Sequence, residues 1–255
     1  MIKLFFFLLF PLSVFASNSV VYNLTDNKIL SGSLDSSPVS IASISKLMTI
    51  YTVLTANQDL TEKLTVEDGR VSNTHIHKGM VVSRLDLVNL SLISSDNLAA
   101  QTLSENFPGG KNNFIQYMNI HAQELGMVNT KFIEPTGLSP MNYSSVDDIV
   151  KLISAVSIFD IVQHAAQSQK VVTSTIIKTK KGKKNVPVSG NPTSHYFGHQ
   201  GIIAIKTGFT RAAGFCITML VYHNNQLYNI TMLGAKTNKE RELFIKQSLN
   251  TIYNA

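Results

Sequence analysis

The sequence predicts an α+β fold in which strands from both ends of the chain share one antiparallel sheet beside a block of helices. Short β-branched and apolar runs occur near the start and through the last third of the chain, whereas the middle repeats apolar residues at helical spacing. The 255 residues are 44% hydrophobic and 15% charged, with 14 Gly and 7 Pro, which excludes a disordered chain and a collagen-like repeat. We expect one domain over residues 17–255, preceded by a short separate segment.

Residues 1–16 are expected to form a secretory signal peptide. Lys3 precedes the apolar run 4–10, and Val14-Phe15-Ala16 favours cleavage after Ala16. The apolar run is shorter than the roughly 20 residues of a membrane-spanning helix, although an uncleaved anchor is the alternative. Because no later segment is long and apolar enough to cross a membrane, we expect a periplasmic chain without a transmembrane segment, either free or loosely associated with the wall or membrane.

Cysteine usage and charge restrict the class of partner. The single cysteine, Cys216, cannot form an internal disulfide, and its place in an apolar strand is typical of a small buried side chain, so we assign it no chemistry. The formal net charge of +6 suits an anionic cell-wall or membrane surface, or serves solubility alone. Neither a nucleic-acid module nor a phosphate-binding glycine loop is recognisable, so no nucleic-acid partner is expected.

In the first half of the chain, local patterns place several elements. They are a hairpin of residues 20–24 and 29–30, helices over 43–54 and 85–93, and a helical restart at 98 after the polar turn 94–97. Residues 60–83 show no clear pattern.

In the second half, helices precede strands. The expected elements are a helix with Phe114, Met118, Ala122 and Leu125 on one face and Gly126 as its cap, a helix from Ser145 to 158, strands over 171–177, 202–206, 214–222 and 227–233, and a final helix from about Asn238. The stretch 178–184 holds five lysines in seven residues and is expected to be a solvated turn.

A serine and a lysine stand three residues apart in Ser43-Ile44-Ser45-Lys46, at the start of the first predicted helix. This spacing lets the hydroxyl and the amine project from one helix face and share a hydrogen bond. A serine hydroxyl is a poor nucleophile, and lysine can take its proton only if burial or nearby positive charge lowers the pKa of the amine. The apolar surroundings of Lys46 offer that burial, although the motif alone is common by chance.

Two more polar motifs follow. Ser95-Asp96-Asn97 either caps a helix, or lets Ser95 relay a proton to a leaving amine while Asn97 hydrogen-bonds the backbone of a peptide substrate. Lys206-Thr207-Gly208 ends an apolar strand, where a glycine allows a substrate strand or a loop to approach closely. The lysine of this motif adds positive charge near the other two motifs.

Together the three motifs form the set found in serine β-lactamases and penicillin-binding proteins. The chain resembles the low-molecular-mass penicillin-binding proteins, the D-alanyl-D-alanine carboxypeptidase and endopeptidase family, over nearly all of residues 17–255. The segments that carry the resemblance are 41–49 (IASISKLMT), 95–100 (SDNLAA), 132–139 (FIEPTGLS) and 206–216 (KTGFTRAAGFC). One departure is Leu98, where relatives usually carry arginine. The resemblance implies a serine β-lactamase/DD-peptidase-like fold.

The resemblance also implies a mechanism and a set of site residues. Ser43 attacks the carbonyl of the penultimate D-alanine of a peptidoglycan stem peptide, Lys46 takes its proton, and water hydrolyses the acyl-enzyme. Backbone N–H groups of Ser43 and Phe209 hold the oxyanion. Ser95 is the third catalytic residue and forms the proton relay with Lys206. The implied substrate contacts beyond these, in chain order, are Asn97, Lys206, Thr207, Gly208 and Arg241. For Arg241, an exposed charge on the terminal helix is the alternative.

The resemblance further implies that β-lactam antibiotics act as covalent inhibitors and that no cofactor is needed. His75-Ile76-His77 could suggest a metal pair, but no third ligand accompanies it in the sequence, so no metal site is expected.

Three other functions compete with this interpretation. Glu134-Pro135 resembles the segment of class A β-lactamases that carries the deacylating glutamate, but the following residues 136–139 match the peptidase family instead. A catalytically silent wall-binding module is a second alternative, against which the three intact motifs argue. Within the family, the length of the chain and segment 134–138 favour a DD-endopeptidase that cuts cross-links, and the alternative is a DD-carboxypeptidase that removes a terminal D-alanine.

Overall fold

The computed structural model describes residues 18–67, 69, 71–179 and 182–254. The expected signal peptide, residues 1–16, lies outside the described residues. Among the described residues, no single helix is long and apolar enough to cross a membrane, and only the helix pair Val146–Val156 and Asp160–Ala166, bent by 106°, passes that test when taken together.

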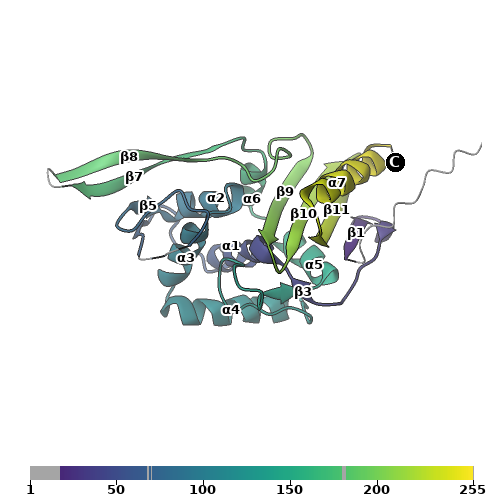
Figure 1. The fold of residues 1–255 in the computed structure, drawn as a ribbon, viewed down its shortest axis with the longest axis horizontal. Coiled ribbons are helices and arrows are strands. Elements are labelled where there is room, and N and C mark those ends of the chain that lie inside the picture. The colour runs from purple at the N-terminus through teal and green to yellow at the C-terminus, as the bar shows by residue number, and fades with distance from the viewer. Residues whose placement is uncertain (1–17, 68, 70, 180–181, 255) are drawn as a thin grey trace, which may run out of the picture.

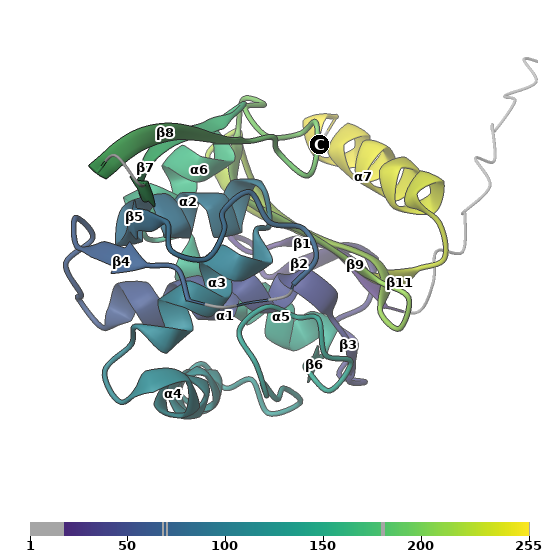
Figure 2. The same ribbon diagram turned by 60° about the vertical axis from the view of Figure 1, so that its left-hand side comes forward.

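The main sheet joins strands from both ends of the chain, and every neighbouring pair is antiparallel, as the sequence predicts. In spatial order its strands are β2 (Lys28–Gly32), β1 (Ser19–Asn23), β11 (Gln226–Ala235), β10 (Gly214–His223) and β9 (Ile202–Thr210). Asn224 and Asn225 connect β10 to β11 with φ of 48° and 60°, the left-handed values of a tight hairpin turn. Helix α7 (Asn238–Tyr253) packs along β10 and β11 (Figures 1 and 2).

The helical block surrounds α1, which is the most central helix. Its members are α1 (Lys46–Thr55), α2 (Arg84–Ile93), α3 (Asn97–Glu105), α4 (Gly110–Glu124), α5 (Val146–Val156) and α6 (Asp160–Ala166). α1 contacts α2, α3, α4 and α5, and α5 joins the block to β10 and β11. A 3-10 turn, η1 (Ala42–Ser45), leads into α1.

Two helix ends match their sequence signals. The Ser145 side chain accepts from the Asp148 backbone N–H at the start of α5, as predicted. Gly126, at φ 69°, follows α4 and donates to the Gln123 carbonyl, which confirms its predicted place after the helix end. The prediction of one helix from Ser145 to 158 is wrong at its end, because α5 stops at Val156 and the chain turns into α6.

A second sheet, with the order β4-β5-β7-β8, was not predicted as a unit. It contains β4 (Lys63–Thr65), β5 (Val81–Ser83), β7 (Val171–Thr179) and β8 (Gly182–Gly190). A two-stranded sheet of β3 (Val39–Ser40) and β6 (Tyr143–Ser144) lies beside the helical block. β7 and β8 form a long hairpin that projects away from the body of the molecule (Figure 1).

The lysine-rich stretch 178–184 is not simply a turn. Pairing from Val171↔Gly190 to Thr179↔Gly182 makes residues 178–179 the end of β7 and residues 182–184 the start of β8, and residues 180–181 lie outside the described residues. β8 has no clear apolar alternation and carries Pro187, which a strand tolerates here because β8 is the edge of its sheet. The sequence pattern therefore missed β8, whose structure depends on its partner β7.

Candidate active site

The three sequence motifs meet in one cleft. η1 and the start of α1 supply the first motif, the turn between α2 and α3 supplies the second, and β9 supplies the third. The cleft has a volume of about 300 Å³ and is lined by Ser43, Ser72, Asn73, Ser95, Asn97, Leu138, Thr193, Thr207, Gly208, Phe209, Phe215, Asn238 and Arg241. Lys46 and Lys206 lie directly behind this lining and are fully buried.

Ser43 and Lys46 form the hydrogen bond that their spacing predicts. The Lys46 Nζ donates to Ser43 Oγ over 2.9 Å. Ala42, immediately before the serine, has a φ of 47°, a left-handed value that is uncommon for a residue with a side chain. Strain of this kind is concentrated at functional sites, where the surrounding structure maintains it.

Lys46 is enclosed by acceptors from three separate parts of the chain. Besides Ser43, its Nζ donates to Asn97 Oδ1 over 2.6 Å and to the Thr136 carbonyl over 2.7 Å. Burial lowers the pKa of Lys46 from 10.5 to about 7, although the carboxylates of Glu134 and Asp96 act in the opposite direction. A lysine with this pKa is present in both its neutral and its charged form near neutral pH, which suits a general base.

Ser95 faces the second buried lysine. The Lys206 Nζ donates to Ser95 Oγ over 2.9 Å and to the Thr207 carbonyl over 2.9 Å. The pKa of Lys206 is lowered well below its usual value, first by burial and then by the positive charges of Lys46 and Arg241. The structure thus brings together the lysine and the serine that the sequence analysis placed in one proton relay.

The backbone at Ser95 is held in a left-handed conformation, with φ of 54°. Asn73, from the stretch that the sequence left unassigned, secures this turn: its Nδ2 donates to the Ser94 carbonyl over 3.0 Å and to the Ser95 carbonyl over 2.8 Å. The Asn73 carbonyl in turn accepts from the Asn97 N–H over 3.1 Å. Sequence reasoning missed Asn73 because its partners lie more than twenty residues away.

The side chains of Asp96 and Asn97 form hydrogen bonds to other groups of the protein. Asp96 caps α3 by accepting from the Ala99 N–H, and it also accepts from the His75 N–H over 2.5 Å. The His75 ring Nδ1 lies 3.2 Å from the same carboxylate. The first histidine of the His75-Ile76-His77 pattern thus contacts Asp96. Asn97 Nδ2 donates to the Ser72 carbonyl over 2.5 Å. The capping interpretation of this motif is therefore confirmed, and the same motif places Ser95 and Asn97 in the lining of the cleft.

Gly208 lies where a side chain could not fit. A Cβ at this position would be 2.9 Å from the Ser43 backbone nitrogen and 3.1 Å from Ala42 Cβ. β9 is also longer than predicted, so that the third motif lies within the strand and pairs with β10 at Cys216↔Gly208 and Ile217↔Thr207. The missing side chain thus brings this strand against the backbone of the nucleophile.

The remaining predicted residues line the cleft from its other side. Thr207 Oγ1 donates to Thr193 Oγ1 over 2.7 Å, which identifies Thr193 as a lining residue that no sequence motif marked. Phe209 is 54% exposed and its ring stacks on Phe215 with 4.2 Å between centroids. Arg241 is only 7% exposed and pairs with Glu242 over 2.9 Å, so the alternative of an exposed charge is wrong.

Glu134 has a structural position that differs from that of a deacylating base. Its carboxylate accepts from the N–H groups of Thr136 and Gly137 over 2.7 Å each, and from Thr136 Oγ1 over 2.5 Å. These bonds hold the loop whose Thr136 carbonyl accepts from Lys46. The contacts argue against the class A β-lactamase alternative, because loop donors occupy both carboxylate oxygens.

Two other observations delimit the site. Burial raises the pKa of the Cys216 thiol to about 11, which keeps it protonated. Within the part of the chain that the structure describes, no group of three or more His, Cys, Asp or Glu side chains is placed to hold a metal ion.

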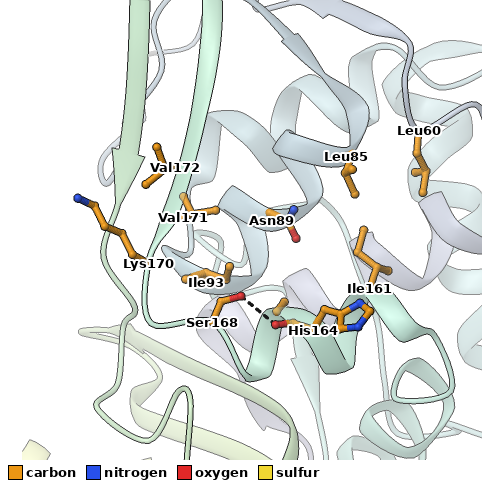
Figure 3. Close-up of a pocket in the computed structure, with 11 residues that line it drawn as sticks. Leu60, Leu85, Asn89, Ile93, Ile161, His164, Ser168, Lys170, Val171 and Val172 are labelled. Carbon is orange, nitrogen blue, oxygen red and sulfur yellow. Dashed lines mark hydrogen bonds between the residues drawn. The ribbon is translucent and has the colours of Figure 1, made fainter.

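A larger cavity, of about 400 Å³, lies between β7, α2 and α6 (Figure 3). Its walls are mainly aliphatic, with Leu60, Leu85, Ile161 and Val172 beside His164 and Lys170. Of the described residues that line it, none is one of the predicted site residues. The chemistry is therefore placed in the smaller cleft.

A serine bonded to a buried lysine of lowered pKa, in a cleft at the edge of a sheet, defines a serine hydrolase that uses an amine as its base. The peptidase S11 family, described as D-alanyl-D-alanine carboxypeptidase, matches residues 10–237. The chain belongs to this family and is a serine-type D-alanyl-D-alanine peptidase.

Curated relatives carry two kinds of name. The D-alanyl-D-alanine endopeptidase of Escherichia coli (strain K12) is 34% identical over 228 residues, covering 86% of this chain and 71% of the relative. That of Pseudomonas aeruginosa is 36% identical over 205 residues, covering 77% of this chain and 64% of the relative. A D-alanyl-D-alanine carboxypeptidase of Bacillus subtilis is 24% identical, covering 92% of this chain and 61% of the relative.

Solved structures share the fold. The Streptomyces K15 DD-transpeptidase superimposes with a TM-score of 0.84 at 22% identity, covering 94% of this chain and 97% of that protein. Penicillin-binding protein D2 of Listeria monocytogenes, in its cefotaxime-bound form, gives a TM-score of 0.77 at 25% identity, covering 93% and 97%. The predicted DD-peptidase-like fold is confirmed.

Proposed function

We propose that this chain is a periplasmic DD-endopeptidase that cuts the cross-links between peptidoglycan stem peptides through an acyl-enzyme on Ser43. The observation that carries the proposal is the pair of buried amines in one cleft, with Lys46 bonded to Ser43 and Lys206 bonded to Ser95. The endopeptidase preference is supported by the names of the two relatives at 34% and 36% identity. A DD-carboxypeptidase is the second candidate, supported by the names of more distant relatives.

In the first step, the neutral Lys46 amine takes the proton of Ser43 while Ser43 Oγ attacks the carbonyl of the penultimate D-alanine. The developing oxyanion accepts from the backbone N–H groups of Ser43 and Phe209. The close approach of β9 to the nucleophile at Gly208 supports this arrangement.

Collapse of the tetrahedral intermediate expels the amine of the neighbouring peptide, which needs a proton. Ser95 Oγ supplies it and is itself reprotonated from Lys206, its hydrogen-bond donor. Water then attacks the ester and gives one proton, through Ser95, to the neutral Lys206, which restores the relay. Lys46 returns its proton to Ser43 Oγ as the ester bond breaks and the second peptide leaves with a free carboxyl group. β-Lactams are expected to acylate the same hydroxyl.

Substrate positioning falls to the remaining cleft residues. Asn97 Nδ2 donates to Ser72 with one hydrogen, and its second hydrogen is available for a substrate carbonyl. Thr207 and Arg241 line the part of the cleft that is expected to receive a carboxylate, for which a buried guanidinium is well suited. No cofactor is required by this mechanism. Export by a signal peptide over residues 1–16 completes the proposal, with residues 17–255 as the catalytic domain.

The test uses the chain from residue 17 onward and a Ser43→Ala variant, incubated with cross-linked muropeptide dimers and uncross-linked pentapeptides. Mass spectrometry should show dimers converted to monomers by the unaltered chain and neither substrate changed by the variant. The free energy of unfolding of the variant should stay within about 1 kcal/mol of the unaltered value, because a half-exposed site serine contributes little packing.

Release of one alanine from pentapeptides, with dimers intact, would favour the carboxypeptidase instead. A Ser43→Ala variant that still binds one penicillin covalently would show that the nucleophile is misassigned. If the unaltered chain gains no mass at saturating penicillin, the silent wall-binding module becomes the better interpretation.

A further inference from the structure

The first turn of α7 forms one border of the cleft. Asn238 and Arg241, three residues apart, both line the cleft and therefore share one face of the helix. Glu242 follows about 100° further around the helix, and it is not one of the described residues that line the cleft. Because consecutive side chains of a helix normally point apart, a contact between Arg241 and Glu242 requires one of them to turn toward the other.

This contact gives the guanidinium of Arg241 a counter-charge within the protein. Arg241 Nη2 donates to Glu242 Oε1 over 2.9 Å, and the two side chains are 9% and 28% exposed. Arg241 Cζ also lies 5.9 Å from the centroid of the Phe215 ring, which is part of the cleft lining. The guanidinium is therefore close both to a wall of the cleft and to Glu242, and a partly buried pair of this kind is screened by solvent less than an exposed one.

The charges of this pair act on groups in and beside the cleft. The positive charge of Arg241 contributes, after burial and Lys46, to the lowered pKa of Lys206. At Tyr196 the two members of the pair have opposite effects, because burial first and Glu242 second raise the pKa of the hydroxyl, whereas Arg241 lowers it. Glu242 therefore offsets part of the positive potential that Arg241 creates around it.

Glu242 has few other contacts that depend on its carboxylate. Its Oε2 has no hydrogen-bond partner among the described residues, and the neighbouring His195 Nδ1 is 3.8 Å away. Among the described residues, Arg241 donates the one hydrogen bond that this carboxylate accepts. A substitution of Glu242 thus changes the charge beside Arg241 and disturbs little else.

We propose that Glu242 is a positioning residue that sets how strongly the cleft binds a substrate carboxylate, because it holds the Arg241 guanidinium and cancels part of its charge. A carboxylate that enters the cleft shares the guanidinium with Glu242, so it binds less tightly than it would to an unpaired arginine. This inference rests on the proposed function, in which Arg241 receives the carboxylate beside the scissile bond. Since the products also carry carboxylates, weaker binding favours their release.

The test compares acylation of Ser43 by benzylpenicillin, which carries a carboxylate, with acylation by its uncharged methyl ester, in the chain from residue 17 onward. Glu242→Gln keeps the shape of the side chain and an oxygen for Arg241 but removes the charge. It should raise the second-order rate with benzylpenicillin about threefold to tenfold relative to that with the ester, through a lower apparent dissociation constant and not a faster limiting rate. Glu242→Asp keeps the charge, and its ratio of the two rates should stay within about twofold of the unaltered ratio.

Glu240→Gln is the matched control, because it makes the same change of charge in the same turn of α7. Glu240 is also partly buried, its carboxylate accepts from the Lys236 backbone N–H over 2.9 Å, and it is not one of the described residues that line the cleft. Its ratio of the two rates should equal that of the unaltered chain.

Three outcomes would overturn the proposal: an unaltered ratio in Glu242→Gln, the same change of ratio in Glu240→Gln, or a lower ratio in both Glu242→Gln and Glu242→Asp, which a purely structural role predicts. Should Glu242→Gln fail to fold, Glu242→Met, uncharged and of similar volume, replaces it under the same criteria. Acylation by both compounds without the expected change of ratio contradicts this inference alone. If neither compound acylates the unaltered chain, the proposed function itself is contradicted.

Discussion

The two buried lysines of the cleft differ in the charges that surround them. Lys46, in the helical block, has three acceptors and two nearby carboxylates, Asp96 and Glu134. Lys206, on the main sheet, has two acceptors, and its charged neighbours are the cations Lys46 and Arg241. Burial lowers the pKa of both amines, but the carboxylates partly restore the basicity of Lys46 only.

This difference suggests separate tasks for the two amines. A general base must be unprotonated in a substantial fraction of molecules and still basic enough to take a proton. A pKa of about 7 meets both conditions for Lys46 near neutral pH. Lys206 lies on the strand that borders the cleft and positions Ser95. Removing each amine in turn therefore separates proton abstraction from proton relay.

Lys46→Met is expected to have the largest effect. Loss of the base should slow penicillin acylation of Ser43 by about 10²–10⁴-fold. Because Asn97 Oδ1 and the Thr136 carbonyl both lose their donor, the free energy of unfolding should also fall, by about 1–3 kcal/mol. Stopped-flow acylation and urea unfolding measure the two quantities, and acylation at the unaltered rate would exclude Lys46 as the base.

The pH dependence of acylation sharpens the same comparison. Lys46 acts when neutral, so the rate should rise with pH, reach half its plateau near pH 7 and fall about tenfold for each pH unit below that. The measurement is the second-order acylation rate of a neutral β-lactam ester between pH 5 and 9. A rate that stays constant across this range would assign the proton to another group.

Lys206→Met should have a smaller effect on rate and a different effect on stability. We expect acylation to fall about tenfold to a hundredfold, as Ser95 loses its donor. Stability should be unchanged or higher, because an apolar side chain of similar volume replaces a buried amine that lies beside other cations. A loss of stability as large as that of Lys46→Met would show that the two environments are equivalent.

Glu134→Gln is expected to have the smallest effect of the three substitutions. The amide keeps one acceptor for the loop but loses the negative charge near Lys46, so acylation and deacylation should fall together, by about tenfold or less. Single-turnover kinetics with a slowly hydrolysed penicillin measure both steps. Selective accumulation of the acyl-enzyme would instead assign Glu134 to deacylation, as in the class A β-lactamases.

The sequence predicted the residues whose chemistry is local and missed those whose contribution depends on the fold. Ser43 and Lys46 are three residues apart, so their contact followed from helical spacing. Thr136 contributes only a backbone carbonyl, from 90 residues away, and no side-chain pattern can mark that role.

Strand prediction failed for a related reason. β8 is polar and mostly exposed, and its structure depends on pairing along β7 rather than on an apolar face. β9 continues through Thr207 and Gly208 because β10 pairs with it there, although the apolar run ends earlier. The fold class was therefore predictable from apolar spacing, whereas the second sheet was not.

The β7–β8 hairpin also determines where the charge of the molecule is located. The chain has 22 basic and 16 acidic residues, and residues 170–190 contain six lysines and no acidic residue, so all other residues together are formally neutral. Each strand has nine residues, about 30 Å, which exceeds the screening length of about 8 Å at physiological ionic strength. The net positive charge of the molecule therefore lies away from its centre of mass. Near a negatively charged surface, the resulting electrostatic torque turns the β7–β8 hairpin toward that surface.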